Sequence, residues 1–158
     1  MLSGRNDNYY INLIYFIYDK FMRNARIIHS LEEDNSKILT SNTIVIADDD
    51  PAILDAMKMI LEFYNYSVVT CADGYVIPLV ATLKPKLLFL DICMSGIDGR
   101  DICKALKKTD GIKDIPVVMI SASCDLLKVV KESGADDYLP KPFEVTDLIS
   151  KVNKYLLN

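Results

Sequence analysis

The sequence predicts an α/β domain in which five parallel strands form one sheet with helices on both faces. From Thr43 onward, short apolar runs rich in β-branched residues alternate with longer runs whose apolar residues recur at helical spacing. This β-α alternation occurs five times, and parallel strands joined by helices require right-handed crossovers that cover the sheet. We therefore expect residues 43–158 to form one domain, preceded by an N-terminal extension at residues 1–42.

The individual elements follow from the positions of apolar runs and turn residues. The predicted strands are Thr43–Ala47, Ser67–Cys71, Lys86–Leu90, Ile115–Ile120 and Ala135–Leu139. Helices are predicted from Pro51 to about Tyr64, then over Tyr75–Leu83, Gly99–Lys108, Leu126–Glu132 and Val145–Leu156. Gly134 suits the end of the fourth helix, whereas Pro78 is an awkward residue for the second.

The first helix has the clearest start signal. Asp50 is a favourable N-cap residue, and Pro51 suits the first helical position. The apolar residues of its predicted buried face are Ile53, Met57, Ile60, Leu61 and Tyr64. Their spacing indicates one buried face along the helix.

Composition excludes several classes of function. A 51 % hydrophobic content is typical of a globular protein, and a net charge of −4 does not favour nucleic acid as a partner. The four cysteines form no C-x-x-C pair, which favours reduced thiols and a cytoplasmic location. His29 is the single histidine, so multi-histidine metal sites and Ser-His catalysis are not expected.

The N-terminal segment Met1–Asn42 differs from the rest of the chain. It contains five basic and five acidic residues, so the net charge of −4 belongs to the remainder. Its apolar run Tyr9–Tyr18 is shorter than the roughly 20 residues that span a bilayer, and no small-residue cleavage site follows it. We expect an extra helix or a poorly ordered extension, and no membrane insertion.

Charged residues follow three of the predicted strands. Asp48, Asp49 and Asp50 follow the first strand, Asp91 the third and Lys141 the last. The carboxyl ends of parallel strands share one crevice, so these side chains should meet in space. Carboxylates with one lysine indicate a site for a divalent cation and a phosphoryl group.

Each of these residues also has a purely structural interpretation. Asp50 alone satisfies a capping role, but Asp48 and Asp49 would then repel each other without benefit, and Mg²⁺ would remove that conflict. Asp91 is either a turn residue or a nucleophile that forms an acyl phosphate. Ser121 and Lys141 are either turn residues or hydrogen-bond donors to phosphoryl oxygens.

With these residues in place, the chain resembles the receiver domain of two-component response regulators. The resemblance covers about Thr43 to Asn158. The matching segments are Ile44–Pro51, Leu90–Gly99, Ile120–Ala122 and Gly134–Phe143. Their order and spacing match together, which makes the resemblance specific.

The resemblance implies a flavodoxin-like (βα)5 fold and a phosphoacceptor at Asp91. The phosphoryl group would come from a partner histidine kinase or a histidine phosphotransfer protein. Mg²⁺ would be held by Asp48, Asp49, Asp91 and the backbone carbonyl of Cys93, while Ser121 and Lys141 would bind the phosphoryl oxygens. Tyr138 would be the aromatic residue that turns inward as Ser121 moves, and the Lys141–Pro142 bond would be cis.

Two positions depart from the family pattern, and two others bear on hydrolysis of the acyl phosphate. Ser95 replaces the usual proline after Met94, and Pro140 replaces the small or β-branched residue before Lys141. Cys93 and Ser123 occupy the positions that tune access of water to the acyl phosphate. Because Cys93 is neither an acid nor an amide, we expect no strong aid to hydrolysis from it.

The resemblance also implies the kind of output. The chain ends after the last predicted helix, so we expect a stand-alone receiver that signals to a downstream protein target, with homodimerisation left open. Beyond its own phosphorylation, it is not expected to be an enzyme. The alternatives are a magnesium-dependent phosphatase with an aspartyl nucleophile, a flavin- or nucleotide-binding domain, and a degenerate receiver that only binds proteins.

Overall fold

The computed structural model describes residues 42–94, 96–122 and 125–157. Within these residues the chain forms a five-stranded parallel sheet in the order β2-β1-β3-β6-β7. The strands are β1 Thr43–Ala47, β2 Ser67–Cys71, β3 Leu87–Asp91, β6 Val117–Ser121 and β7 Asp137–Pro140. The predicted N-terminal segment lies outside the described residues except for Asn42, and so do Ser95 and Ser123.

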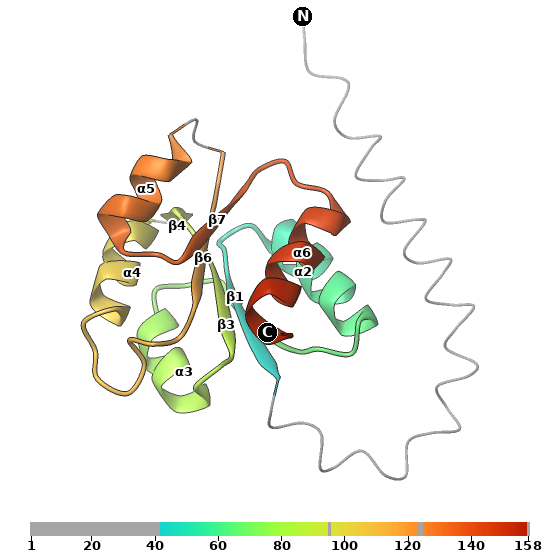
Figure 1. The fold of residues 1–158 in the computed structure, drawn as a ribbon, viewed down its shortest axis with the longest axis horizontal. Helices are drawn as coiled ribbons and strands as arrows, with labels where there is room; N and C mark the ends of the chain where they lie inside the picture. Colours follow the sequence, from blue (N-terminus) through green and yellow to red (C-terminus); the bar gives the residue numbers. More distant parts are fainter. Residues whose placement is uncertain (1–41, 95, 123–124, 158) are drawn as a thin grey trace, which may run out of the picture. The chain divides into compact units, whose positions relative to one another are not determined.

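Helices cover the sheet on both sides, as a doubly wound fold requires (Figure 1). They are α2 Pro51–Phe63, α3 Val76–Leu83, α4 Gly99–Leu106, α5 Leu126–Ser133 and α6 Val145–Leu156. Figure 1 shows α2 and α6 on one face, and α3, α4 and α5 on the other. The predicted alternation of strands and helices is therefore confirmed. No helix in the described ranges is both long enough and apolar enough to cross a bilayer.

Helix α2 begins as predicted but buries a slightly different set of residues. The Asp50 carboxylate accepts a hydrogen bond from the Ala52 backbone amide at 2.9 Å, and Pro51 is the first helical residue. The buried positions are Leu54, Met57, Ile60 and Leu61, whereas the predicted Ile53 is only partly buried. The prediction for Tyr64 was wrong: it is the C-cap residue, and 46 % of it is exposed. The chain leaves helical geometry at Tyr64, so the buried face of α2 ends before this residue.

Helix α3 tolerates Pro78 because of where the helix starts. It begins at Val76, which places Pro78 in the first turn. Backbone amides of the first turn have no acceptor within the helix, so the missing N–H of proline costs nothing there. Val76 and Val80 carry the buried side of this helix.

Three strand ends lie further along the chain than predicted. Strand β3 includes Asp91, β6 includes Ser121 and β7 includes Pro140. The ladders explain the difference, because Asp91 pairs with Ile120 and Ser121 pairs with Pro140. The polar side chains of Asp91 and Ser121 and the ring of Pro140 suggested that each strand ends one residue earlier. Pairing with the neighbouring strand nevertheless continues through these residues.

The core is centred on the inner strands β1, β3 and β6. All five residues of β3 and of β6 are buried, as expected for parallel strands covered on both faces. The largest fully buried side chains include Phe89, Leu88, Leu90, Met119 and Ile120. The core therefore supports the ends of β1 and β3 from both sides.

A short hairpin between β3 and α4 was not predicted. Strands β4 (Cys93–Met94) and β5 (Ile97–Asp98) are antiparallel, and Cys93 pairs with Asp98. Each strand has two residues, too few to produce a recognisable alternation of apolar and polar positions. Gly96 supplies the positive φ of 77° within the connection.

The cysteines of the described ranges are free thiols. Cys71 and Cys103 are buried, and Cys93 is exposed. Burial raises the pKa of the Cys103 thiol to about 11, so this residue stays neutral in the core. This agrees with the interpretation of reduced thiols for the three cysteines described.

We predict that Leu88→Ala lowers the free energy of unfolding by about 2–5 kcal/mol, because it opens a cavity in the centre of the sheet. Leu88 is fully buried in β3, whereas the matched control Leu127 on α5 is 72 % exposed. Leu127→Ala should change stability by less than about 0.5 kcal/mol. Urea unfolding followed by circular dichroism measures both, and equal losses would contradict the described core.

Candidate functional site

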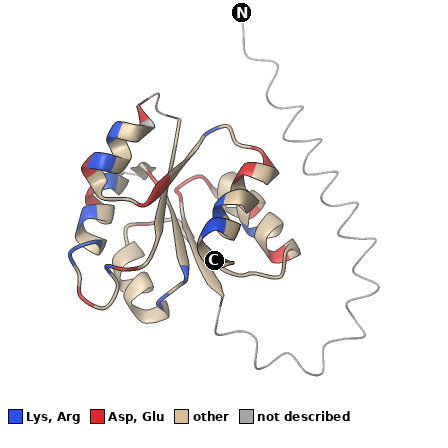
Figure 2. Ribbon diagram, viewed as in Figure 1, with Lys and Arg blue, Asp and Glu red and all other residues tan. Residues whose placement is uncertain are grey.

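Four of the predicted site residues lie at the carboxyl edge of the sheet. Asp48 directly follows β1, Asp91 ends the neighbouring β3, Ser121 ends β6, and Lys141 directly follows β7. In Figure 2, acidic residues mark the loop that leads from β1 into α2, whereas lysine and arginine gather on α4 and α5. The strand order thus brings together side chains that are up to 93 residues apart.

Lys141 bridges the two buried carboxylates. Its Nζ lies 2.7 Å from Asp48 Oδ2 and 2.7 Å from Asp91 Oδ1. The side chains of Asp48 and Asp91 are 1 % and 6 % exposed, and that of Lys141 is 20 % exposed. One ammonium therefore serves two carboxylates that are almost completely removed from water, and the three groups together keep a net negative charge.

Backbone amides complete the hydrogen bonding of both carboxylates. The Asp50 amide donates to Asp48 Oδ1 at 2.9 Å, and the Cys93 amide donates to Asp91 Oδ2 at 2.7 Å. All four carboxylate oxygens therefore have a donor, which holds both groups in one orientation. Such preorganisation suits a reacting group.

Burial and hydrogen bonding shift the pKa values of Asp48 and Lys141. Burial raises the pKa of Asp48, and it outweighs the hydrogen bonds from Lys141 and the Asp50 amide that lower it. Burial alone would lower the pKa of Lys141, but the hydrogen bonds to Asp48 and Asp91 outweigh it and raise the pKa. Lys141 therefore stays charged, and its ion pairs contribute stability below the ordinary lysine pKa that is lost only as pH rises through the higher folded value.

Asp49 joins the two buried carboxylates to form a cluster of oxygen ligands. One carboxylate oxygen from each of Asp48, Asp49 and Asp91 lies within 4.8 Å of the others, and Asp49 is partly buried. Carboxylate oxygens are the ligands that hard divalent cations such as Mg²⁺ prefer. The donor set therefore fits the predicted cation, and Cys93 begins the hairpin directly beside it.

The predicted site also includes Ser121, Tyr138 and the Lys141–Pro142 bond. Ser121 is buried, and its backbone carbonyl accepts a hydrogen bond from the Lys141 amide at 2.7 Å. The Lys141–Pro142 bond is cis, as predicted. Tyr138 is partly buried on β7, where the Lys151 amine lies 5.3 Å from the centre of its ring. It is thus in contact with α6, and its predicted movement remains a prediction.

Gly99 is a supporting residue whose role the sequence did not reveal. A Cβ atom at this position would overlap the backbone carbonyl oxygen of Asp91. The Gly99 amide also donates to the Ile92 carbonyl at 2.8 Å. A glycine at the start of a helix is a weak signal, so only the packing of α4 against the end of β3 shows why a side chain is excluded here.

Comparisons with known proteins agree with this fold and show the family of the chain. A family model described as the response regulator receiver domain matches residues 44–153, and the chain belongs to this family. Over 116 residues it is 38 % identical to the DNA-binding dual master transcriptional regulator RpaA of Synechocystis sp., covering 72 % of this chain and 48 % of RpaA. It is 34 % identical to the DNA-binding response regulator MtrA of Mycolicibacterium smegmatis, covering 72 % and 50 %. The chain thus spans about half the length of these relatives.

Solved structures of response regulators share this fold. A putative response regulator from Chloroflexus aurantiacus J-10-fl has a TM-score of 0.69 and 29 % identity, covering 74 % of this chain and 98 % of that one. The chemotaxis protein CheY4 of Vibrio cholerae has a TM-score of 0.67 at 24 % identity, covering 73 % and 98 %, a likeness of fold alone. The predicted flavodoxin-like fold and the predicted receiver family are both confirmed.

We predict that Lys141→Met lowers the free energy of unfolding at pH 7 by about 2–3 kcal/mol, because two buried carboxylates lose their common cation. The deficit should shrink on acidification to about pH 5, since burial already raises the pKa of Asp48 and loss of the Lys141 hydrogen bond, which lowers it, lets Asp48 protonate at higher pH. Lys108→Met, at an exposed lysine beyond α4, is the control. Urea unfolding at the two pH values measures the effect, and a deficit independent of pH would refute it.

Gly99→Ala should destabilise the domain by about 1–3 kcal/mol, because its methyl group would overlap a backbone carbonyl that cannot rotate away. Gly74→Ala is the matched control. Its methyl group would meet Cδ1 of Ile97, the far end of a flexible side chain that can move away. We expect a loss below about 1 kcal/mol there. The prediction fails if thermal or urea unfolding shows the two substitutions to be equally tolerated.

Proposed function

We propose that Asp91 accepts a phosphoryl group from the phosphohistidine of a partner kinase or phosphotransfer protein. A carboxylate oxygen of Asp91 forms a bond to phosphorus while the bond between phosphorus and the histidine nitrogen breaks. The nitrogen keeps the electron pair and takes a proton from solvent, and Asp91 becomes an acyl phosphate. The rival phosphatase would need an acid two residues after the nucleophile, where this chain has Cys93.

The contact between Lys141 and Asp91 is the observation that carries this proposal. The ammonium lies 2.7 Å from Asp91 Oδ1 and can pair with phosphoryl oxygens that arrive at the same carboxylate. The Cys93 amide holds the other oxygen at 2.7 Å, so the nucleophile is oriented before the donor arrives. Ser121, buried at the end of the next strand, would donate its hydroxyl to the modified group.

Asp48, Asp49 and Asp91 would hold Mg²⁺ together with the backbone carbonyl of Cys93. When bound, the cation would offset the repulsion between the carboxylates and the incoming phosphoryl group. The convergence of the three carboxylates supports this assignment. Lys141 would then exchange part of its contact with Asp48 and Asp91 for contact with phosphoryl oxygens.

Phosphorylation would act by shifting a conformational equilibrium. The phosphoryl group can favour one state only through contacts that differ between states, and here these are the contacts of Ser121 and Lys141. Tyr138 on the edge strand β7 would be the switch aromatic, leaving its present contact with Lys151 as Ser121 moves. The altered surface would then bind a downstream protein.

The kind of output remains a prediction. RpaA and MtrA are described as DNA-binding, but this chain matches only about half of each. We propose protein partners for residues 43–158 and no direct contact with nucleic acid, in line with their net negative charge. The cytoplasmic location stays a prediction, and homodimerisation stays open.

We predict that Asp91→Asn abolishes acceptance of a phosphoryl group from acetyl phosphate in the presence of Mg²⁺, because the amide is not a competent nucleophile. Intact-mass spectrometry of the full chain would show one added phosphoryl group in the wild type. Removing Mg²⁺ with a chelator should also abolish it. Asp101→Asn, at a 73 % exposed carboxylate on α4, is the control and should be modified normally. Continued modification of Asp91→Asn would place the acceptor elsewhere.

A further inference from the structure

The hairpin that follows Asp91 helps to orient the Asp91 carboxylate, because it holds the oxygen that Lys141 does not contact. Asp91 Oδ2 accepts a hydrogen bond from the Cys93 amide at 2.7 Å, so the carboxylate orientation depends on the position of Cys93. Cys93 is in turn paired with Asp98 across the two short strands β4 and β5. A hairpin of two paired positions contributes little stability by itself. Its geometry must therefore be held by contacts at its ends.

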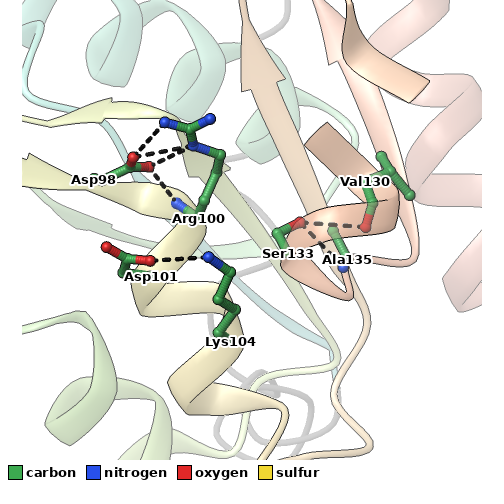
Figure 3. A network of polar contacts seen from close by, with 7 residues as sticks. All are labelled: Asp98, Arg100, Asp101, Lys104, Val130, Ser133 and Ala135. Carbon is green, nitrogen blue, oxygen red and sulfur yellow. Dashed lines mark hydrogen bonds and ion pairs between the residues drawn. The ribbon is translucent and has the colours of Figure 1, made fainter. Parts of the chain in front are cut away.

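Arg100 holds the Asp98 end of this hairpin through a bidentate ion pair (Figure 3). Its Nε lies 2.9 Å from Asp98 Oδ1 and 3.0 Å from Oδ2, and its Nη2 lies 2.6 Å from Oδ2. The Arg100 backbone amide also donates to Asp98 Oδ1 at 2.9 Å. The Asp98 carboxylate thus accepts hydrogen bonds from a backbone amide at the helix N-terminus and from the guanidinium of the same residue. Lysine cannot reproduce the two-pronged contact of the guanidinium.

Helix α4 links this ion pair to the end of β3. The helix begins at Gly99, whose amide donates to the Ile92 carbonyl at 2.8 Å and whose Cα leaves no room for a side chain beside the Asp91 carbonyl. Arg100 therefore joins the far strand of the hairpin to a helix start that is itself packed against Asp91. These contacts form a ring. It runs from the Asp91 carboxylate through Cys93 to Asp98 and Arg100, and it returns through Gly99 to the Asp91 backbone.

We infer that Arg100 is a positioning residue for phosphoryl acceptance, acting through Asp98 and the Cys93 amide on the Asp91 carboxylate. This inference rests on the proposed function of Asp91. Loss of the guanidinium leaves the N-cap of Asp98 in place but frees its second oxygen. The hairpin then samples more positions, and the Cys93 amide holds Asp91 Oδ2 for a smaller fraction of the time.

The same helix supplies a matched control. Lys104 forms an ion pair with Asp101 at 3.1 Å, one turn further along α4, and Figure 3 shows it beside the Asp98–Arg100 pair. Its carboxylate partner is 73 % exposed and does not belong to the hairpin. Lys104→Ala therefore removes a charge and an ion pair from α4 but keeps the hydrogen bonds between Arg100 and Asp98, on which the Lys104 charge acts only as the last of several causes that lower the Asp98 pKa.

The experiment compares the full-length wild type with Arg100→Ala, Arg100→Lys and Lys104→Ala. The first measurement is hydrogen exchange of the Cys93 amide by NMR without phosphodonor, which should be about tenfold faster in Arg100→Ala. The second is the initial rate of phosphorylation by acetyl phosphate with Mg²⁺, which should fall on the order of tenfold. Lys104→Ala should match the wild type in both, and Arg100→Lys should be intermediate because it keeps the charge without the fork.

Each other outcome counts against the inference. If exchange at Cys93 is the same in Arg100→Ala and Lys104→Ala, Arg100 does not hold the hairpin. A slower rate with unchanged exchange shows instead that Arg100 contacts the phosphodonor, and faster exchange with an unchanged rate removes its link to the reaction. A wild type that accepts no phosphoryl group overturns the proposed function and this inference together, whereas a wild type and Arg100→Ala with equal rates overturn the inference alone.

Discussion

The bridge from Lys141 to Asp48 and Asp91 is the interaction on which the site depends. Removing a carboxylate from water costs several kcal/mol, about twice that for two, and their mutual repulsion adds to the cost. A single ammonium at 2.7 Å from both offsets much of this cost. Because two carboxylates meet one ammonium, the site keeps a net negative charge. This charge suits the divalent cation proposed above, and the ammonium suits the proposed phosphoryl group.

The sheet topology separates the two halves of this bridge. Asp48 follows β1 and Asp91 ends β3, two strands that lie inside the sheet, whereas Lys141 follows the edge strand β7. The two carboxylates are thus anchored by the core. The backbone of Lys141 is held at the edge by the hydrogen bond from its amide to the Ser121 carbonyl. A new charge at Asp91 would more readily move the edge strand than the centre of the sheet.

A second buried charge holds the edge strand to α6. Asp137 at the start of β7 lies 2.7 Å from the amines of both Lys151 and Lys154. Burial alone would raise the pKa of Asp137, but the hydrogen bonds from these lysines outweigh it and lower the pKa. Its contribution to stability is therefore present above the ordinary aspartate pKa and is lost as pH falls through the lower folded value. Lys151 contacts Tyr138 as well, so α6 constrains the residue proposed as the switch.

The sequence by itself determined the alternation of strands and helices, the start of α2 at Asp50 and Pro51, and the meeting of Asp48, Asp91 and Lys141. These features follow from local rules, since apolar spacing reports burial, capping residues report helix ends, and parallel strands share one carboxyl edge. Only the tertiary structure decided that Lys141 contacts both carboxylates, that Asp91 and Ser121 still belong to their strands, and that Tyr64 is exposed.

The hairpin after Asp91, the close approach of Gly99 and the ion pair of Arg100 also became visible only in three dimensions. Two-residue strands carry no periodic signal, and a glycine at a helix start has the same sequence pattern whether or not a backbone lies against it. Distances of this kind depend on strand order and register, and on how closely a helix packs against a strand end. Those quantities are set by the packing of the whole chain, and residue patterns along a single segment do not contain them.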